Sequence, residues 1–172
     1  HDYRVLASTL LSTPNYSFDL TAIALIIFVV ELQIPNLSPV AGVKLGLANI
    51  ITVYAVYRCK WSEAALMLLA RVLLGSFFSS NPSALLYSLS GGTFCLLGML
   101  PLKKIIPINR LWLCSVFGAV LHNLGQLTAA SLIMKTAAVW FYLPPLVLSG
   151  CIAGALTGLA AQLVIKRTEK IK

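Results

Sequence analysis

Acidic residues are scarce in this chain of 172 residues. Charged residues of both signs make up only 10% of the composition, whereas a soluble domain carries about 25%. Enzymes that bind diphosphates through Mg²⁺ need clustered carboxylates to hold the metal. The five acids here are scattered and form no cluster: Asp2, Asp19, Glu31, Glu63 and Glu169. That chemistry is therefore excluded.

Motifs for other catalytic and metal-dependent functions are also missing. The four cysteines (Cys59, Cys95, Cys114 and Cys151) form no CxxC pair, and most fall in apolar segments. They are typical of small packing residues rather than of a metal site or a disulfide framework. No GxxxxGK[ST], GxSxG or HExxH sequence occurs. We therefore expect no enzyme activity, no ATPase of its own, no cofactor and no metal.

Hydrophobic residues, in contrast, are abundant. They account for 59% of the chain, and its mean hydropathy is +0.89. A soluble fold of about this size still exposes roughly 30% of the surface of its unfolded chain, so it could not hide so much apolar area. Residues 22–30 and 64–69 are continuous apolar runs without the alternation of barrel strands. The sequence therefore predicts an all-α membrane protein.

Six membrane-spanning helices are predicted, within one domain. Each needs about 20 apolar residues, or fewer inside a bundle. We place them at residues 18–34, 43–57, 61–78, 82–102, 111–134 and 141–165. An N-terminal cytoplasmic segment (1–17) precedes this transmembrane domain (18–165), and a basic tail (166–172) follows it.

Prolines mark most of the breaks between the predicted helices. Pro35 and Pro39 end the first helix, and Pro82 suits the first turn of the fourth. We expect that a loop is bracketed by Pro101 and Pro107, and that the sixth helix is kinked or delayed by the pair at 144–145.

Basic residues lie at the ends of the apolar segments. The net charge is +8, but the basic residues do not form a stripe on a soluble face, so we do not expect the protein to bind nucleic acid. With six spans, one side of the membrane carries ten of the thirteen: Arg4, Arg58, Lys60, Lys103, Lys104, Arg110, Lys166, Arg167, Lys170 and Lys172. Since cytoplasmic loops are rich in Lys and Arg, both termini are predicted to be cytoplasmic in the cell membrane.

Arg71 lies near the middle of the third predicted helix. A charged side chain there costs about 2.5–3.5 kcal/mol on translocon scales, so it must face the bundle interior, a partner or a wet cavity. Two interpretations stay open. Arg71 could contact a substrate, or it could form a structural ion pair, for instance with Glu31 or Glu63, or bond to backbone carbonyls.

His122, Asn123 and Gln126 form a polar cluster in the fifth predicted helix. His122 lies about 18 Å along the helix from Arg110, near the midplane, and shares a face with Gln126. Lining of a binding site is the favoured interpretation, and interhelical hydrogen bonding is the alternative.

Two further regions could contribute to a site. Lys44 and Asn49 open the second predicted helix, and Lys44 could meet an anionic ligand or reach the lipid headgroups. Tyr87 lies close to a glycine pair, 91–92, in the fourth. Glycines 150, 154 and 158 repeat every four residues in the sixth, a pattern for close helix packing. The candidate substrate-binding residues are thus Lys44, Asn49, Arg71, Tyr87, His122, Asn123 and Gln126.

Three of these stretches carry a resemblance to a known family: AGVKLGLANI (41–50), LYSLSGG (86–92) and GAVLHNLGQ (118–126). The chain resembles the Gx transporter family, whose members are often labelled heptaprenyl diphosphate synthase component I. That group is similar to the S components of energy-coupling factor (ECF) transporters. The resemblance implies a six-helix subunit that binds a vitamin, cofactor or cofactor precursor under the loop joining the first two helices. A transmembrane T component and two cytoplasmic ATPase subunits would drive import.

Two other functions stay open at the level of sequence. The chain could be an accessory membrane subunit of a prenyl diphosphate synthase, or a stand-alone secondary transporter. The scarcity of carboxylates within the spans argues mildly against the latter. A ligand that is anionic or bears carbonyl groups is favoured, with quinone precursors, flavin-like, haem-like and isoprenoid compounds as candidates.

Overall fold

The computed structural model describes residues 49–79 and 82–169, and this part of the chain is helical throughout. Five α-helices follow one another: α3 (Asn49–Arg58), α4 (Trp61–Ser79), α5 (Pro82–Ile105), α6 (Leu111–Met134) and α7 (Leu143–Glu169). Two short 3₁₀ segments, η1 (Ile108–Arg110) and η2 (Ala137–Tyr142), precede α6 and α7. The all-α prediction is confirmed here. The predicted span 18–34 and the start of 43–57 lie outside the described residues.

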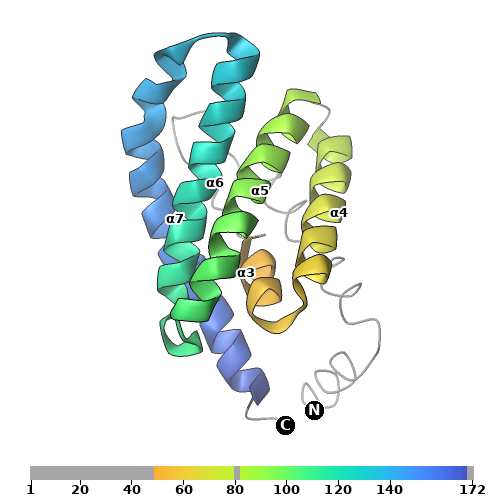
Figure 1. Cartoon of the computed structure of the whole chain (residues 1–172), viewed down its shortest axis with the longest axis vertical. Helices are drawn as coiled ribbons and strands as arrows, with labels where there is room; N and C mark the ends of the chain where they lie inside the picture. Colours follow the sequence, from red (N-terminus) through yellow and green to blue (C-terminus); the bar gives the residue numbers. More distant parts are fainter. Residues whose placement is uncertain (1–48, 80–81, 170–172) are drawn as a thin grey trace.

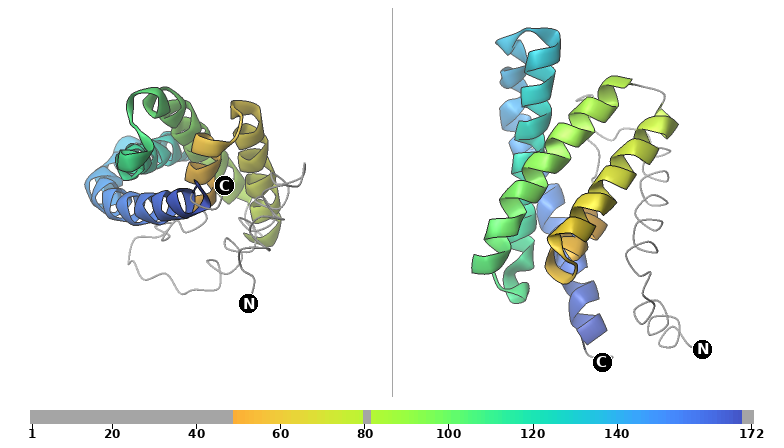
Figure 2. Two further views of the ribbon diagram at one scale, coloured as in Figure 1. Left: turned by 90° about the horizontal axis from the view of Figure 1, so that it is seen from below. Right: turned by 45° about the vertical axis from the view of Figure 1, so that its right-hand side comes forward.

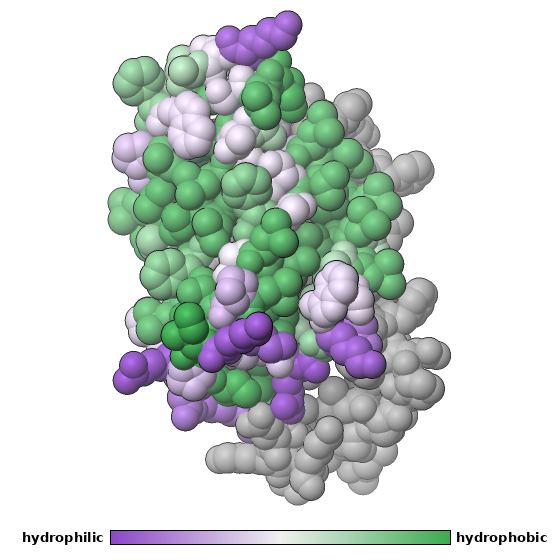
Figure 3. Space-filling view, viewed as in Figure 1, coloured by the Kyte–Doolittle hydropathy of each residue, from purple (hydrophilic) through white to green (hydrophobic). Residues whose placement is uncertain are grey.

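Three helical stretches are long and apolar enough to cross a membrane: Leu85–Ile105, Ile108–Met134 and Ala137–Lys166. The shortest has 21 residues, which corresponds to about 30 Å, the thickness of a bilayer's hydrocarbon core. Hydrophobic side chains cover the middle of the face seen in Figure 3, and hydrophilic ones gather toward its ends. The protein is therefore a membrane protein with transmembrane helices.

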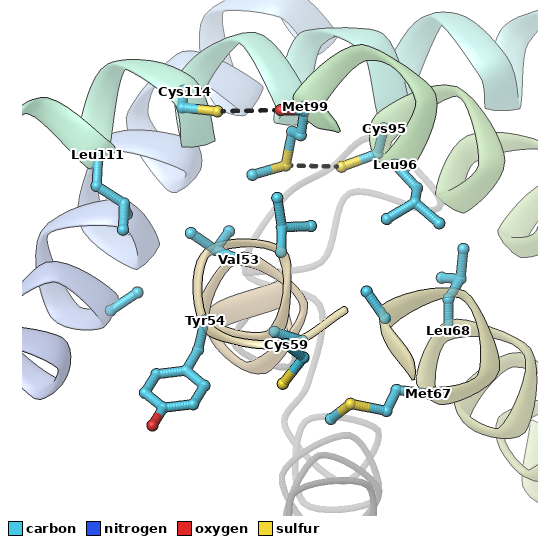
Figure 4. Close-up of a cluster of buried hydrophobic side chains, with 14 of the residues drawn as sticks. Val53, Tyr54, Cys59, Met67, Leu68, Cys95, Leu96, Met99, Leu111 and Cys114 are labelled. Carbon is cyan, nitrogen blue, oxygen red and sulfur yellow. Dashed lines mark hydrogen bonds between the residues drawn. The ribbon is translucent and has the colours of Figure 1, made fainter. Parts of the chain in front are cut away.

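The short helix α3 lies among the longer ones (Figure 1 and Figure 2). Figure 4 looks along it and shows α5 and α6 on one side, with α4 and α7 flanking it. Val53 and Val56 of α3, Met99 of α5, and Cys114 of α6 are almost completely buried there, together with Ile165 of α7. This core anchors α3, so polar groups on α3 are held against the neighbouring helices.

Prolines have two different effects on these helices. Pro144 and Pro145 lie in the first turn of α7, where no backbone N–H donor is needed, so the helix begins immediately before them. The expectation that Pro101 marks the loop after the fourth predicted helix is wrong, because α5 continues through it to Ile105. Pro101 removes one N–H near the helix end, so only the carbonyl four residues earlier loses its usual partner.

The glycine repeat of α7 packs against α6. A Cβ added to Gly154 would lie 2.8 Å from Cα of Val116, and one added to Gly158 would lie 2.6 Å from Cα of Trp112. Both distances are too short for a side chain, so the two backbones touch. The predicted role of this repeat in packing within the bundle is confirmed.

Candidate functional site

Arg71 of α4 points into the bundle and is only 9% exposed. Its Nη1 donates a hydrogen bond to Oγ1 of Thr52 on α3 at 3.2 Å, and Thr52 is itself buried. The prediction that Arg71 faces the interior is confirmed. This bond links α3 to α4 in the interior of the bundle.

Two buried side-chain polar atoms lack a hydrogen-bond partner among the described residues: Nδ1 of His122 on α6 and Oε1 of Gln162 on α7. The one on His122 belongs to the predicted polar cluster. The charge of Arg71 is close enough to act on the imidazole electrostatically. Leaving a buried polar group unsatisfied costs about 1–3 kcal/mol, so a group that bonds to Nδ1 would recover that cost.

Gly91 and Gly92 of α5 separate the two helices that carry these side chains. A Cβ on Gly91 would lie 2.8 Å from the backbone oxygen of His122 and 3.0 Å from its Cε1. A Cβ on Gly92 would lie 2.6 Å from Cδ1 of Leu68, which is one turn from Arg71 on α4. The glycine pair therefore lets α4 and α6 approach α5 from two sides at one level.

Gln126 and Tyr87 flank this level. A Cβ on Gly91 would lie 2.8 Å from Cγ of Gln126, so Gln126 and His122 both pack against Gly91. Tyr87 lies one turn before Gly91 on α5 and is half-buried. The glycine pair is thus contacted by Leu68 of α4 and by His122 and Gln126 of α6. Arg71 and Thr52 join α4 to α3 within about a turn of Leu68.

Asn123 faces a different helix from His122. Its Nδ2 donates to the backbone oxygen of Leu146 on α7 at 2.6 Å, beside Gly150. This is interhelical hydrogen bonding, the alternative that the sequence left open for the cluster. A second bond of this kind joins Ser115 of α6 and Thr157 of α7 at 3.2 Å. Consecutive residues on a helix point about 100° apart, which explains why Asn123 and its neighbour separate.

Two candidate residues cannot be placed. Lys44 lies outside the described residues, and Asn49 begins α3 with a side chain outside the described set. Thr52, in turn, did not stand out in the sequence. Nothing marks it there, because a threonine in a membrane helix ordinarily bonds to a carbonyl of its own helix.

The imidazole of His122 and the amide of Gln126, which lie beside Gly91, can donate and accept hydrogen bonds. The guanidinium of Arg71 can only donate them. Within residues 49–79 and 82–169, no three His, Cys, Asp or Glu side chains gather as metal ligands. The arrangement suits a ligand that accepts and donates hydrogen bonds.

Comparison with known proteins places the chain in a family. A family model described as heptaprenyl diphosphate synthase component I matches residues 20–164, which is most of the sequence. Neither a curated protein nor a solved structure matches the chain. Because the match covers well over half of the sequence, the chain belongs to the heptaprenyl diphosphate synthase component I family.

Proposed function

We propose that this protein is the substrate-binding membrane subunit of an ECF-type importer for a vitamin, cofactor or cofactor precursor. In this proposal six helices span the cell membrane, both termini are cytoplasmic, and the chain has no enzymatic activity. The ligand binds beside the glycine pair of α5, near His122 and Gln126 of α6 and Arg71 of α4.

The unpartnered Nδ1 of His122 is the observation that carries the proposal. The hydrocarbon core of a bilayer supplies no water to hydrogen-bond such an atom. Polar side chains inside membrane helices are costly and often line substrate pathways. Gln126 lies beside His122 at Gly91, and the charge of Arg71 acts on the imidazole. A bound molecule that hydrogen-bonds to Nδ1 would satisfy this atom and contact the neighbouring polar side chains.

Charge favours an anionic or carbonyl-bearing ligand. Residues 64–168 include no carboxylate, while Arg71 is buried within the same stretch. The guanidinium presents donors in a planar fork that matches carboxylate and phosphate groups. A quinone precursor, a flavin, a haem or an isoprenyl phosphate would satisfy this requirement.

Import needs energy, and the sequence contains no ATP-binding loop. We propose that a transmembrane T component and two cytoplasmic ATPase subunits supply it. The basic end of the bundle, where α3, α5 and α7 end, would then face the cytoplasm.

Ligand binding by the purified protein tests the proposal. Four probes would be titrated in detergent: riboflavin, haem, a naphthoquinone carboxylate and farnesyl phosphate. We expect a shift in melting temperature with one of them, and at least a tenfold loss of affinity in His122→Ala. Lys135→Ala is the matched control, since Lys135 is exposed beyond the opposite end of α6. Equal affinity in His122→Ala and wild type would show that the ligand does not bind at His122.

Reconstitution then tests the mode of transport. Uptake of the bound probe into proteoliposomes should require the T component, both ATPase subunits and ATP. Uptake by this chain alone would instead identify a stand-alone secondary transporter.

The family description favours a second candidate function, an accessory membrane subunit of a prenyl diphosphate synthase. In that case the protein would hold the growing isoprenoid while a separate catalytic subunit performs the chemistry. Adding the purified protein to that catalytic subunit in vesicles should change product length or rate. If neither changes, this candidate fails.

A further inference from the structure

The corner between α5 and α6, residues 103–112, has a fixed backbone. The N–H of Ile106 donates to the oxygen of Leu102 at 2.8 Å, and that of Arg110 donates to Pro107 at 2.9 Å. The hydroxyl of Tyr57 on α3 donates to the oxygen of Ile106 at 3.2 Å. Inward, Ile106 and Ile108 pack against the core. The backbone that carries the outward side chains of the corner is therefore held in place by hydrogen bonds and core packing.

Those outward side chains combine positive charge with apolar bulk. Lys104 and Arg110 are exposed, six residues apart on the one corner. Ile105 is 78% exposed and Trp112 is 37% exposed. Exposed apolar side chains are costly in water, and tryptophan beside cations is typical of the boundary between lipid and water.

Lys103, next to Lys104 in sequence, makes a hydrogen bond within the protein. Its Nζ donates to the backbone oxygen of Val56 at 2.6 Å, so it stabilises the end of α3. Lys104 points outward instead. The nearest acids along the chain, Glu63 and Glu169, lie outside the stretch 64–168. Glu63 accepts a hydrogen bond from the backbone N–H of Lys60 at 3.0 Å, at the start of α4.

The whole end of the bundle shares this charge. The end of α3, the start of α4 and the end of α7 also lie there (Figure 1), and hydrophilic side chains gather at that end in Figure 3. The described basic residues at these positions are Arg58, Lys60, Lys103, Lys104, Arg110 and Lys166, whereas Lys135 follows the opposite end of α6. Among the described residues, these six basic side chains outnumber the two acids at this end, Glu63 and Glu169, so the end carries a net positive charge.

We propose that the corner between α5 and α6 binds the headgroup of an anionic phospholipid. Lys104 and Arg110 contact its phosphate and anionic headgroup, while Ile105 and Trp112 contact the glycerol and upper acyl region. Charge complementarity selects this occupant, and the exposed Ile105 and Trp112 require one with an apolar part. This surface lies at the end of the bundle and is separate from His122, so its test is independent of the proposed transport function.

Tryptophan fluorescence provides a direct test, because the chain has only three tryptophans. A protein carrying Trp61→Phe and Trp140→Phe keeps Trp112 as its single emitter. It would be reconstituted in phosphatidylcholine vesicles with increasing brominated phosphatidylglycerol or, in parallel, brominated phosphatidylcholine. We expect half-maximal quenching at a mole fraction at least about fivefold lower for the phosphatidylglycerol, since each of the two basic residues near an anionic headgroup contributes up to about that factor.

Charge-removing variants decide whether the corner is responsible. In Lys104→Gln with Arg110→Gln the two quenching curves should coincide, and 1 M salt should bring them together in the parent protein. Lys135→Gln should keep the preference. Each single variant provides the same comparison if the double variant does not reconstitute. Equal quenching by both lipids in the parent, or a preference that survives the double variant, would overturn the proposal.

Discussion

Arg71 and Thr52 join α4 to α3 through a hydrogen bond of 3.2 Å between Nη1 and Oγ1. α3 has only ten residues, and both partners are buried. The bond therefore links the short helix α3 to α4, and on α4 it is made about one turn from Leu68, which contacts Gly92.

A double-mutant cycle on this pair should show coupling. We expect Thr52→Val and Arg71→Met each to lower the free energy of unfolding, with a coupling energy of about 0.6–1.7 kcal/mol, the range of hydrogen bonds measured within membranes. Equilibrium unfolding in mixed micelles measures it. Thr52→Ser keeps the hydroxyl and should stay close to wild type. A coupling energy of zero would show that the bond contributes nothing.

Gly91 and Gly92 should differ in their tolerance of a methyl group. In Gly91→Ala the new Cβ would meet the backbone oxygen of His122 at 2.8 Å, and a backbone cannot move aside easily. In Gly92→Ala it would meet the end of the flexible Leu68 side chain. We expect Gly91→Ala to cost about 1–3 kcal/mol of stability and Gly92→Ala clearly less. The reverse order in thermal unfolding would contradict this contact geometry.

Asn123 should contribute to stability as a donor. Asn123→Ala removes its bond to Leu146 and should cost about 0.6 kcal/mol, and up to about 1.7. Asn123→Asp should cost more at neutral pH, because a carboxylate cannot donate to a carbonyl. A protonated Asp can donate, so the stability of this variant should rise as the pH falls. An Asp variant as stable as Asn at pH 8 would exclude the assigned bond.

Lys103 and Lys104 form a matched pair of adjacent cations. Lys103→Gln removes the charged donor to Val56 and should lower stability by about 1.5–3 kcal/mol. Lys104→Gln should change it by less than about 0.5 kcal/mol in detergent, because Lys104 is exposed. Chemical unfolding of both variants provides the comparison, and equal losses would be inconsistent with a cap on α3.

Several helix ends could be predicted from short stretches of sequence. α6 begins and ends at the predicted residues 111 and 134, and α5 begins at Pro82 as expected. These boundaries depend on local causes, namely charged residues, proline geometry and the end of an apolar run. The sixth predicted helix began at 141, but α7 begins at Leu143 after a 3₁₀ segment. Such a segment differs from an α-helix by a small change in backbone hydrogen bonding.

Composition and periodicity by themselves determined that this is a helical membrane protein with a few polar residues in its interior. Lipid offers no hydrogen bonds, so every apolar run had to be a helix, and a polar residue within one was expected to face the bundle interior. Only the tertiary structure decided what each one contacts there. Asn123 pairs with α7, Arg71 pairs with Thr52, and Nδ1 of His122 is left without a partner among the described residues. These outcomes depend on how the helices rotate and approach one another, and glycines at the contacts set that approach.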